Sequence, residues 1–215
     1  MWSVGWGRNV ATMVEDVQEL VVRAQAGDGQ AFGQLYEQFS PEINRYLARH
    51  LNGQREAAED LTAEVFLKVL ERIHSYQFRG MPFSAWLYRI ARNHMIDYLR
   101  SRPRQIATSL DDVPEIPEKK AEQVIDRSLD RHELSYALDR VTSDQRQVVT
   151  LRFLDGFTTA EAAGIIGKSE DAVKKLQSRG LAQLRRIIEQ ARHIEAVPSA
   201  RAGNEMPRLM GLGAA

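Results

Sequence analysis

The chain has 215 residues, of which 43% are hydrophobic and 27% charged, and its formal net charge at pH 7 is zero. Its length and composition suit one or two small globular domains. Without cysteine it has no disulfide, thiolate metal ligand or cysteine nucleophile, and its five histidines are too far apart for metal-ligand spacing, so we expect no metal or other cofactor. No apolar run reaches the length of a membrane span and the N-terminus lacks a signal-peptide core, so a cytoplasmic protein without membrane insertion is expected.

The charges are distributed unevenly along the chain. Residues 79–104 hold six Arg against one Asp, whereas residues 105–135 hold eight acidic against four basic residues. Residues 168–192 again hold seven basic against three acidic residues. Two basic segments that flank an acidic connector indicate two surfaces for nucleic acid.

The hydrophobic pattern predicts helices throughout. Apolar residues keep helical spacing over 14–26, 32–47, 56–75 and 82–101. No segment of useful length alternates with a period of two, so the expected fold class is all-α, with two small helical domains joined by a flexible acidic linker. The expected division is an unassigned N-terminal extension (1–13), a first domain (14–104), the linker (105–131), a second domain (132–192) and a disordered tail (193–215).

The helix over 56–75 has two different faces. Leu61, Val65, Val69 and Ile73 form an apolar stripe at four-residue intervals. The opposite face carries carboxylates around a leucine, which suits a basic, partly apolar partner helix. From the residues alone, a solvated acidic face is the simpler interpretation.

Residues 76–100 combine aromatic and basic side chains. Aromatic rings can stack on unpaired bases, and arginines neutralise the phosphates between them. Asn93 can both donate and accept hydrogen bonds at a base edge, so it could read sequence. Phe83 and Trp86 fall within the apolar pattern and are expected in the core.

The second domain carries the pattern of a helix-turn-helix. Thr142 and Thr158 each begin a capping box, which Gln145 and Glu161 complete. Gly167 supplies the turn before the last helix. The outer face of that helix is basic and polar in its N-terminal half, which suits a DNA major groove. A plain helical bundle with a solvated basic face stays open at this point.

Four strings of the chain resemble group 4 (extracytoplasmic function, ECF) sigma factors of the sigma-70 family. They are AGDGQAFGQLYEQF, AEDLTAEVFLKVL, FSAWLYRIARNHMIDYLR and ALDRVTSDQRQVVTLRFLDGFTTAEAAGIIGKSEDAVKKLQSRGLAQLR. The resemblance covers roughly residues 20–104, as region 2, and 134–188, as region 4. Leu176 and Gln177 stand where the family frequently has an Arg-Leu pair, so the −35 sequence cannot be read from the resemblance.

The resemblance implies a role in promoter-specific transcription initiation, without enzymatic activity or catalytic residues. The implied partners are core RNA polymerase, through its β′ clamp helices and β flap, promoter DNA that is duplex at −35 and single-stranded at −10, and an anti-sigma factor. The residues implied for polymerase binding are Asp60, Glu64, Leu67, Lys68 and Glu71. Those implied for the −10 element are Tyr76, Phe78, Arg79, Arg89, Arg92, Asn93 and Arg100. Those implied for the −35 element are Thr159, Lys168, Glu170, Lys174, Lys175, Ser178 and Arg179.

Two other functions compete with this one. A stand-alone helix-turn-helix regulator would bind duplex DNA without polymerase and would give residues 76–100 no role. An RNA-binding or sequestering protein would use those residues without promoter specificity. Zero net charge favours a subunit that depends on polymerase, because a free-standing DNA binder usually carries a basic surplus.

Overall fold

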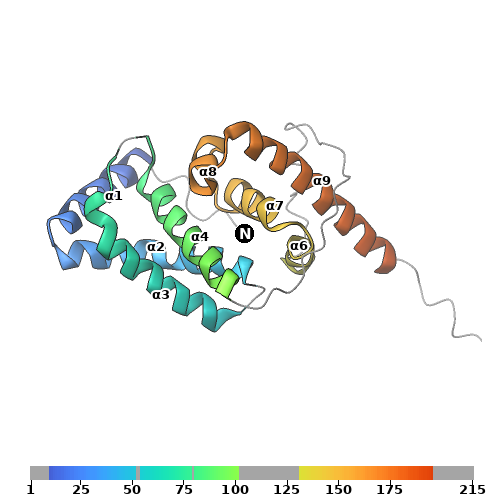
Figure 1. The fold of residues 1–215 in the computed structure, drawn as a ribbon, viewed down its shortest axis with the longest axis horizontal. Helices are drawn as coiled ribbons and strands as arrows, with labels where there is room; N and C mark the ends of the chain where they lie inside the picture. The colour runs from blue at the N-terminus through green and yellow to red at the C-terminus, as the bar shows by residue number, and fades with distance from the viewer. Residues whose placement is uncertain (1–9, 52–53, 79, 102–130, 196–215) are drawn as a thin grey trace, which may run out of the picture.

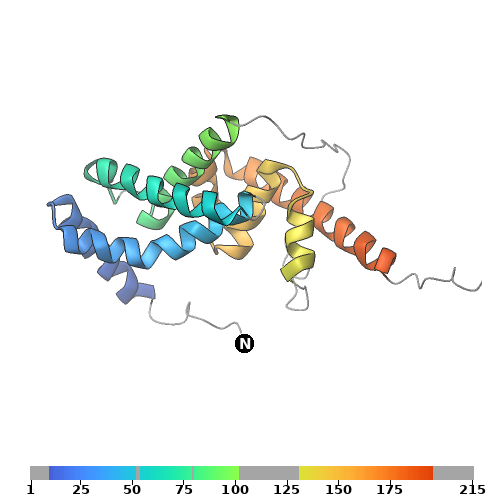
Figure 2. The same ribbon diagram turned by 90° about the horizontal axis from the view of Figure 1, so that it is seen from below.

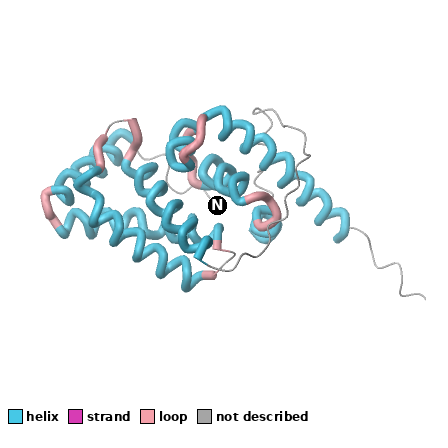
Figure 3. Tube along the Cα trace, in the orientation of Figure 1, coloured by secondary structure: helices cyan, strands magenta, loops and turns pink. Residues whose placement is uncertain are grey.

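The computed structural model describes residues 10–51, 54–78, 80–101 and 131–195. Helices account for the regular structure of these residues, and no strand occurs among them (Figure 3). This confirms the expected all-α fold class. No helix within the described ranges is long and apolar enough to cross a membrane.

Two groups of helices follow each other along the chain (Figure 1). The first contains α1 (Val10–Gln25), α2 (Gly29–His50), α3 (Arg55–Arg72), the 3₁₀ turn η1 (Ile73–Ser75) and α4 (Phe83–Ser101). The second contains α6 (Arg131–Leu138), α7 (Ser143–Val149), the π-helical turn η3 (Thr150–Leu154), α8 (Thr159–Ile166) and α9 (Glu170–Glu195). The end of α9 extends away from the first group in both views (Figures 1 and 2).

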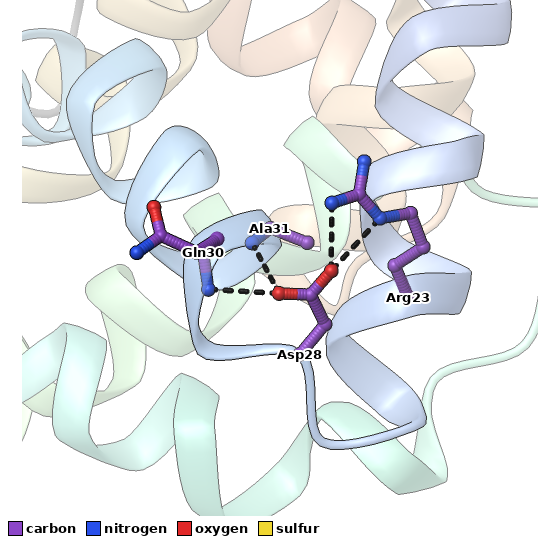
Figure 4. A network of polar contacts seen from close by, with 4 residues as sticks. All are labelled: Arg23, Asp28, Gln30 and Ala31. Atoms are coloured by element: carbon purple, nitrogen blue, oxygen red, sulfur yellow. Dashed lines mark hydrogen bonds and ion pairs between the residues drawn. The ribbon is translucent and has the colours of Figure 1, made fainter.

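Asp28 fixes the turn between α1 and α2 (Figure 4). Its Oδ1 accepts hydrogen bonds from the backbone N–H groups of Gln30 (2.9 Å) and Ala31 (3.2 Å), which caps α2. Its Oδ2 pairs with Arg23 Nη2 at 2.7 Å. The hydrogen bond from Arg23 is the main reason that the pKa of Asp28 lies below its usual value.

The core of the first group lies between α2, α3 and α4. The stripe expected on α3 is confirmed, since Leu61, Val65, Val69 and Ile73 are all buried. They pack with apolar residues of α2 and α4, among them Leu35, Ile43, Leu47, Leu87 and Met95. Phe83 is buried as expected, and Trp86 is half-buried against the rings of Tyr76 and Phe83.

Both expected capping boxes are present in the second group. The Thr142 hydroxyl caps α7 and the Thr158 hydroxyl caps α8, and in each case the side chain three residues later accepts a hydrogen bond from the threonine backbone N–H. Gly167 ends α8 with φ +74°, a left-handed conformation that favours glycine. Ser169 Oγ accepts from the N–H of Ala172 at 3.2 Å, at the start of α9. These local signals explain why the turn between α8 and α9 was predictable.

Two expected boundaries differ from the structure. Helix α1 begins at Val10, so helical structure starts inside the extension expected over 1–13. Helix α9 continues to Glu195, past the expected start of the tail at 193. The bidentate pair between Arg192 and Glu133 ties this last part of α9 to α6, a long-range contact that the sequence pattern does not reveal. Of the linker expected over 105–131, only Arg131 is among the described residues. Residues 196–215 of the expected tail also lie outside them.

Candidate nucleic-acid interface

Helix α3 presents an exposed face opposite its buried stripe. Asp60, Glu64 and Glu71 are exposed on it and Lys68 is half-buried, around a Leu67 side chain that is 61% exposed. The structure therefore brings together all five residues expected to bind polymerase. Sequence reasoning missed a second apolar residue, Leu70, which is 49% exposed. Its position three residues after Leu67, off the buried stripe, was the available signal.

A side-chain hydrogen bond links α3 to α4. His94 Nε2 on α4 contacts the carboxylate of Glu64 on α3. Glu64 is one of the residues expected to bind polymerase. The contact places the acidic face of α3 directly beside the helix that carries the expected −10 residues.

The segment after η1 holds two aromatic residues in different environments. Tyr76 is buried, and its hydroxyl donates to the carbonyl of Met81 at 3.0 Å. Burial raises the pKa of Tyr76 to about 12. Gln25 Nε2 donates to the Tyr76 carbonyl at 2.9 Å, which ties this segment to α1. In this conformation Tyr76 supports the segment and offers no exposed ring.

Phe78 is the exposed aromatic residue of the same segment. Its side chain is 39% exposed, and its ring centroid lies 5.0 Å from that of Tyr76 in an edge-on arrangement. A base could therefore reach the Phe78 ring while Tyr76 holds it from behind. Arg79, also expected at this site, lies outside the described residues.

Helix α4 divides the other expected −10 residues between two environments. Arg89, Asn93 and Arg100 are exposed, and their spacing of four and seven residues places them along one side of the helix. Arg92 is half-buried, and its Nε donates to Gln147 Oε1 on α7 at 2.7 Å. Three of these polar groups are thus exposed, Arg100 with Asp97 at 4.0 Å beside it, whereas the fourth is engaged by the second group of helices.

Helices α8 and α9 form a helix-turn-helix with a basic outer surface. Lys174, Lys175 and Arg179 are exposed on α9, and Glu170 is exposed at its first turn. Lys168, in the turn, is exposed and pairs with Asp144 at 3.1 Å. The remaining expected −35 residues, Thr159 and Ser178, are half-buried.

The inner face of α9 orients this surface. Val173, Gly180 and Leu184 are buried. Gln177 is buried too and accepts a hydrogen bond from Arg152 Nε in η3 at 3.1 Å. Gln177 therefore supports the helix-turn-helix from inside and is not part of its outer surface. Its departure from the Arg-Leu pair that is frequent in the family did not indicate this role.

The described residues do not provide a ligand set for a metal ion. Among the described residues, no group of three or more His, Asp or Glu side chains is placed to hold a metal ion. The features brought together are an acidic and apolar face on α3, a polar side of α4 next to Phe78, and a basic helix-turn-helix.

Comparison with known proteins identifies the family. A family model for sigma-70 region 2 matches residues 35–105, and a model for sigma-70 region 4 matches residues 137–186. The ECF RNA polymerase sigma factor BldN of Streptomyces coelicolor is 39% identical over 174 residues, which are 80% of this chain and 66% of BldN. The ECF RNA polymerase sigma factor ShbA of Streptomyces griseus is 33% identical over 181 residues, which are 80% of this chain and 94% of ShbA. The chain belongs to the ECF sigma factors of the sigma-70 family.

A solved structure of a sigma factor has a similar fold. The sigma factor RpoE from Bartonella quintana, solved in complex with the anti-sigma factor NepR, matches with a TM-score of 0.58 and 25% identity. The match covers 74% of this chain and 96% of that one. In this ECF chain, α2, α3 and α4 carry region 2, and α7, α8 and α9 carry region 4. The family models do not set domain limits, so the division at 14–104 and 132–192 stays a prediction.

Proposed function

We propose that this protein binds core RNA polymerase and directs it to promoters, with region 4 reading the −35 duplex and region 2 opening and capturing the −10 element. The observation that carries the proposal is one chain with three distinct surfaces: the Leu67 face of α3, the Phe78–Arg89–Asn93 side of region 2, and the basic side of α9. In this role the protein is an initiation factor and does no covalent chemistry itself.

The polymerase contact is proposed for the outer face of α3. An exposed leucine surrounded by carboxylates complements a partner helix that is basic with an apolar patch. Apolar contact at Leu67 and Leu70 supplies affinity, and the carboxylates of Asp60 and Glu71 supply orientation and rate of association. The β′ clamp helices are the partner that the family implies for this face, and the β flap for region 4.

Capture of the −10 strand is proposed for Phe78 and the exposed side of α4. Opening a duplex costs about 1.4 kcal/mol per base step in lost stacking. Stacking a base on an aromatic ring returns about 1–3 kcal/mol. Phe78 can supply such a ring, Arg89 and Arg100 can hold phosphates, and Asn93 can hydrogen-bond a base edge.

Reading of the −35 element is proposed for α9. Lys174, Lys175 and Arg179 lie on the exposed side of its first half, where a recognition helix contacts DNA. Lys168 adds positive charge in the preceding turn, although its pairing with Asp144 lowers its share. Glu170 at the helix start could accept from a cytosine amino group.

Three further properties follow from the proposed role. The relative RpoE was solved with an anti-sigma factor, and we propose that this chain has such a partner as well. Because promoters lie on the chromosome, a protein that acts on them is expected in the cytoplasm.

We also propose that the acidic connector over 105–131 occupies a nucleic-acid path in polymerase until RNA displaces it. An abortive-initiation assay with Asp111, Asp112, Glu115 and Glu118 neutralised tests this role.

Run-off transcription tests the proposal directly. Bacterial core polymerase is supplied with a library of upstream fragments, with and without the protein. Transcripts that begin at discrete sites only when the protein is present would support the proposal, and their aligned upstream regions would give its −35 and −10 sequences. If no transcripts form but the protein alone binds duplex DNA tightly, the stand-alone regulator becomes the better assignment.

A further inference from the structure

Gln25, the last residue of α1, binds the backbone of the turn that follows α3. Its Nε2 donates to the carbonyl oxygen of Ile73 at 2.8 Å and to that of Tyr76 at 2.9 Å. A side-chain amide has two N–H donors, and both are used here on two backbone acceptors. Because both partners can only accept, the nitrogen of the amide must face them and its oxygen must point away. Gln25 therefore fixes the beginning and the end of η1.

The two carbonyls lie where a helix ends and no following helical turn supplies a donor. The Ile73 carbonyl accepts from the Tyr76 N–H at 3.1 Å, which closes η1, and Gln25 adds a donor from another helix. Val21 and Ala24 of α1 belong to the same buried apolar cluster as Ile73 and Tyr76. Apolar packing thus places α1 beside η1, and the half-buried Gln25 amide sets the direction of the two carbonyls.

Tyr76 connects this turn to the ring that is proposed to meet the −10 strand. The Tyr76 hydroxyl donates to the Met81 carbonyl at 3.0 Å, across the segment between η1 and α4. The exposed ring of Phe78 lies edge-on against the Tyr76 ring, with centroids 5.0 Å apart. Phe78 follows Tyr76 by only two residues, so a rotation of the Tyr76 peptide would move the Phe78 ring away from this support.

We propose that Gln25 is a positioning residue for −10 capture, which holds the Tyr76 backbone so that the Phe78 ring is presented to an unpaired base. The inference rests on the proposed function, because Phe78 meets DNA only in that role. Gln25 lies before residues 35–105, which match the region 2 model, and it acts through the backbone without touching a base. A ring that is ordered before DNA arrives does not have to be ordered during binding, which favours capture.

Two variants remove the donors of Gln25 in different ways. Gln25→Met keeps the length of the side chain and its preference for a helix but has no N–H group. Gln25→Glu also keeps the shape, but at neutral pH it places carboxylate oxygens against two carbonyl oxygens. Glutamate could replace a residue that only fills space, but it cannot replace a donor. Gln18→Met, at an exposed position about two turns earlier on α1, is the matched control.

Hydrogen exchange in the free, full-length protein measures whether Gln25 holds the turn. The Tyr76 N–H donates to the Ile73 carbonyl, which Gln25 also binds. In both Gln25 variants the backbone amides over 74–78 should exchange about tenfold faster, because the turn opens more easily without the two side-chain hydrogen bonds. Exchange within α3 and α4 should match the parent in every variant, and Gln18→Met should match it over 74–78 as well.

Binding of a single-stranded −10 oligonucleotide to core polymerase loaded with each variant measures the effect on capture. Fluorescence anisotropy should show about five- to tenfold weaker binding for both Gln25 variants, with parent-like affinity for core polymerase. If Gln25 acts through the Phe78 ring, this loss should disappear in a Phe78→Ala background. A general weakening of the fold would instead add to the effect of Phe78→Ala.

The outcomes separate the positioning role from the proposed function. Faster exchange over 74–78 in both Gln25 variants, with a loss of oligonucleotide affinity that disappears in the Phe78→Ala background, supports the role. Parent-like exchange in either variant, or a loss of affinity that persists in full without the Phe78 ring, overturns it. If the parent protein loaded on core polymerase does not bind the −10 strand, the proposed function fails and the capture role fails with it. Exchange in the free protein would still show whether Gln25 holds the turn.

Discussion

Arg92 of region 2 is held by Gln147 of region 4 through a hydrogen bond of 2.7 Å from Nε to Oε1. Gln147 is buried, whereas Arg92 is half-buried. A side chain expected at the −10 element is therefore already occupied in the free protein. If Arg92 contacts the −10 strand as proposed, region 4 and DNA compete for the same guanidinium.

Gln147→Met should release Arg92. Methionine keeps the length of the side chain but has no oxygen to replace the Gln147 acceptor, which lies 2.7 Å from Arg92 Nε. The Arg92 guanidinium then recovers a hydrogen bond only by turning to solvent or to a phosphate. We expect severalfold tighter binding of a single-stranded −10 oligonucleotide by the free protein, in line with one charge-assisted hydrogen bond. Fluorescence anisotropy measures it. Gln190→Met, an exposed position on α9, is the control, and equal affinities of the two variants would contradict the prediction.

Asn93 and Arg89 should act differently at the −10 element. Asn93→Ala removes a group that can hydrogen-bond a base, so discrimination against substituted −10 sequences should fall by about 1–3 kcal/mol at one position. Arg89→Ala removes a charge and should weaken all sequences alike. Permanganate reactivity of open complexes on a set of −10 variants distinguishes the two. Gln38→Ala, exposed on α2, should change neither. Uniform weakening by Asn93→Ala would contradict a base-reading role.

Leu67→Ala should weaken binding to core polymerase without affecting folding. The side chain is 61% exposed in the free protein, so its loss should change the free energy of unfolding by less than about 0.5 kcal/mol. If it packs against the polymerase, truncation should weaken the complex about tenfold. Titration of labelled protein with core polymerase measures this. Val22→Ala, 54% exposed on α1, is the control, and equal affinities for the two variants would remove Leu67 from the interface.

Lys174→Ala should reduce the salt dependence of −35 binding. Each phosphate contact contributes about one unit to the slope of log affinity against log salt concentration. Holoenzyme binding to a duplex −35 fragment, measured over a range of salt, should therefore lose about one unit of slope. Arg185→Ala is the control on the same helix, because Arg185 pairs with Glu189 at 2.7 Å and lies beyond the exposed basic half. An unchanged slope in Lys174→Ala would place it away from the DNA backbone.

Local chemistry explains why much of the fold could be predicted. The capping boxes at Thr142 and Thr158 and the glycine at 167 act within a few residues, so sequence spacing was enough to place α7, α8 and the turn before α9. The stripe from Leu61 to Ile73 is likewise a property of one helix. The positions of the exposed residues of α3 followed directly from the positions of that stripe.

Long-range contacts explain what the sequence could not provide. Nothing near Arg92 in the chain indicates Gln147, 55 residues away, and nothing near Asp155 indicates Arg49, 106 residues away. Tyr76 and Phe78 have equal claims in the sequence, yet packing against Phe83 and Trp86 buries the first and leaves the second exposed. The contact between regions 2 and 4 depends on such pairs and was not expected.

His50 should make the folded protein less stable in mild acid. It is fully buried at the end of α2, and burial lowers its pKa from 6.5 to about 4. Its Nδ1 donates to the Tyr46 carbonyl at 2.8 Å, which leaves the Nε2 lone pair buried without a partner in the described structure. The nearby Arg146, Arg49 and Arg92 also disfavour the protonated ring.

The direction of the pH effect follows from which state binds the proton. Between about pH 6.5 and 4 the unfolded chain protonates His50 and the folded protein does not, so the free energy of unfolding falls as the pH falls. From pH 7 to 5.5 the loss due to this group should be about 1 kcal/mol. Burial raises the pKa of Asp155, which acts in the opposite direction. When the parent is compared with a His50 variant that keeps Asp155, the contribution of Asp155 is the same in both proteins and cancels.

Urea unfolding of the parent and of His50→Gln, each at pH 7 and pH 5.5, isolates the histidine. Glutamine can still donate to the Tyr46 carbonyl but does not titrate. The parent should therefore lose about 1 kcal/mol more than the variant over this interval, even if the variant is less stable at both pH values. Equal losses in the two proteins would mean that water reaches His50 in solution.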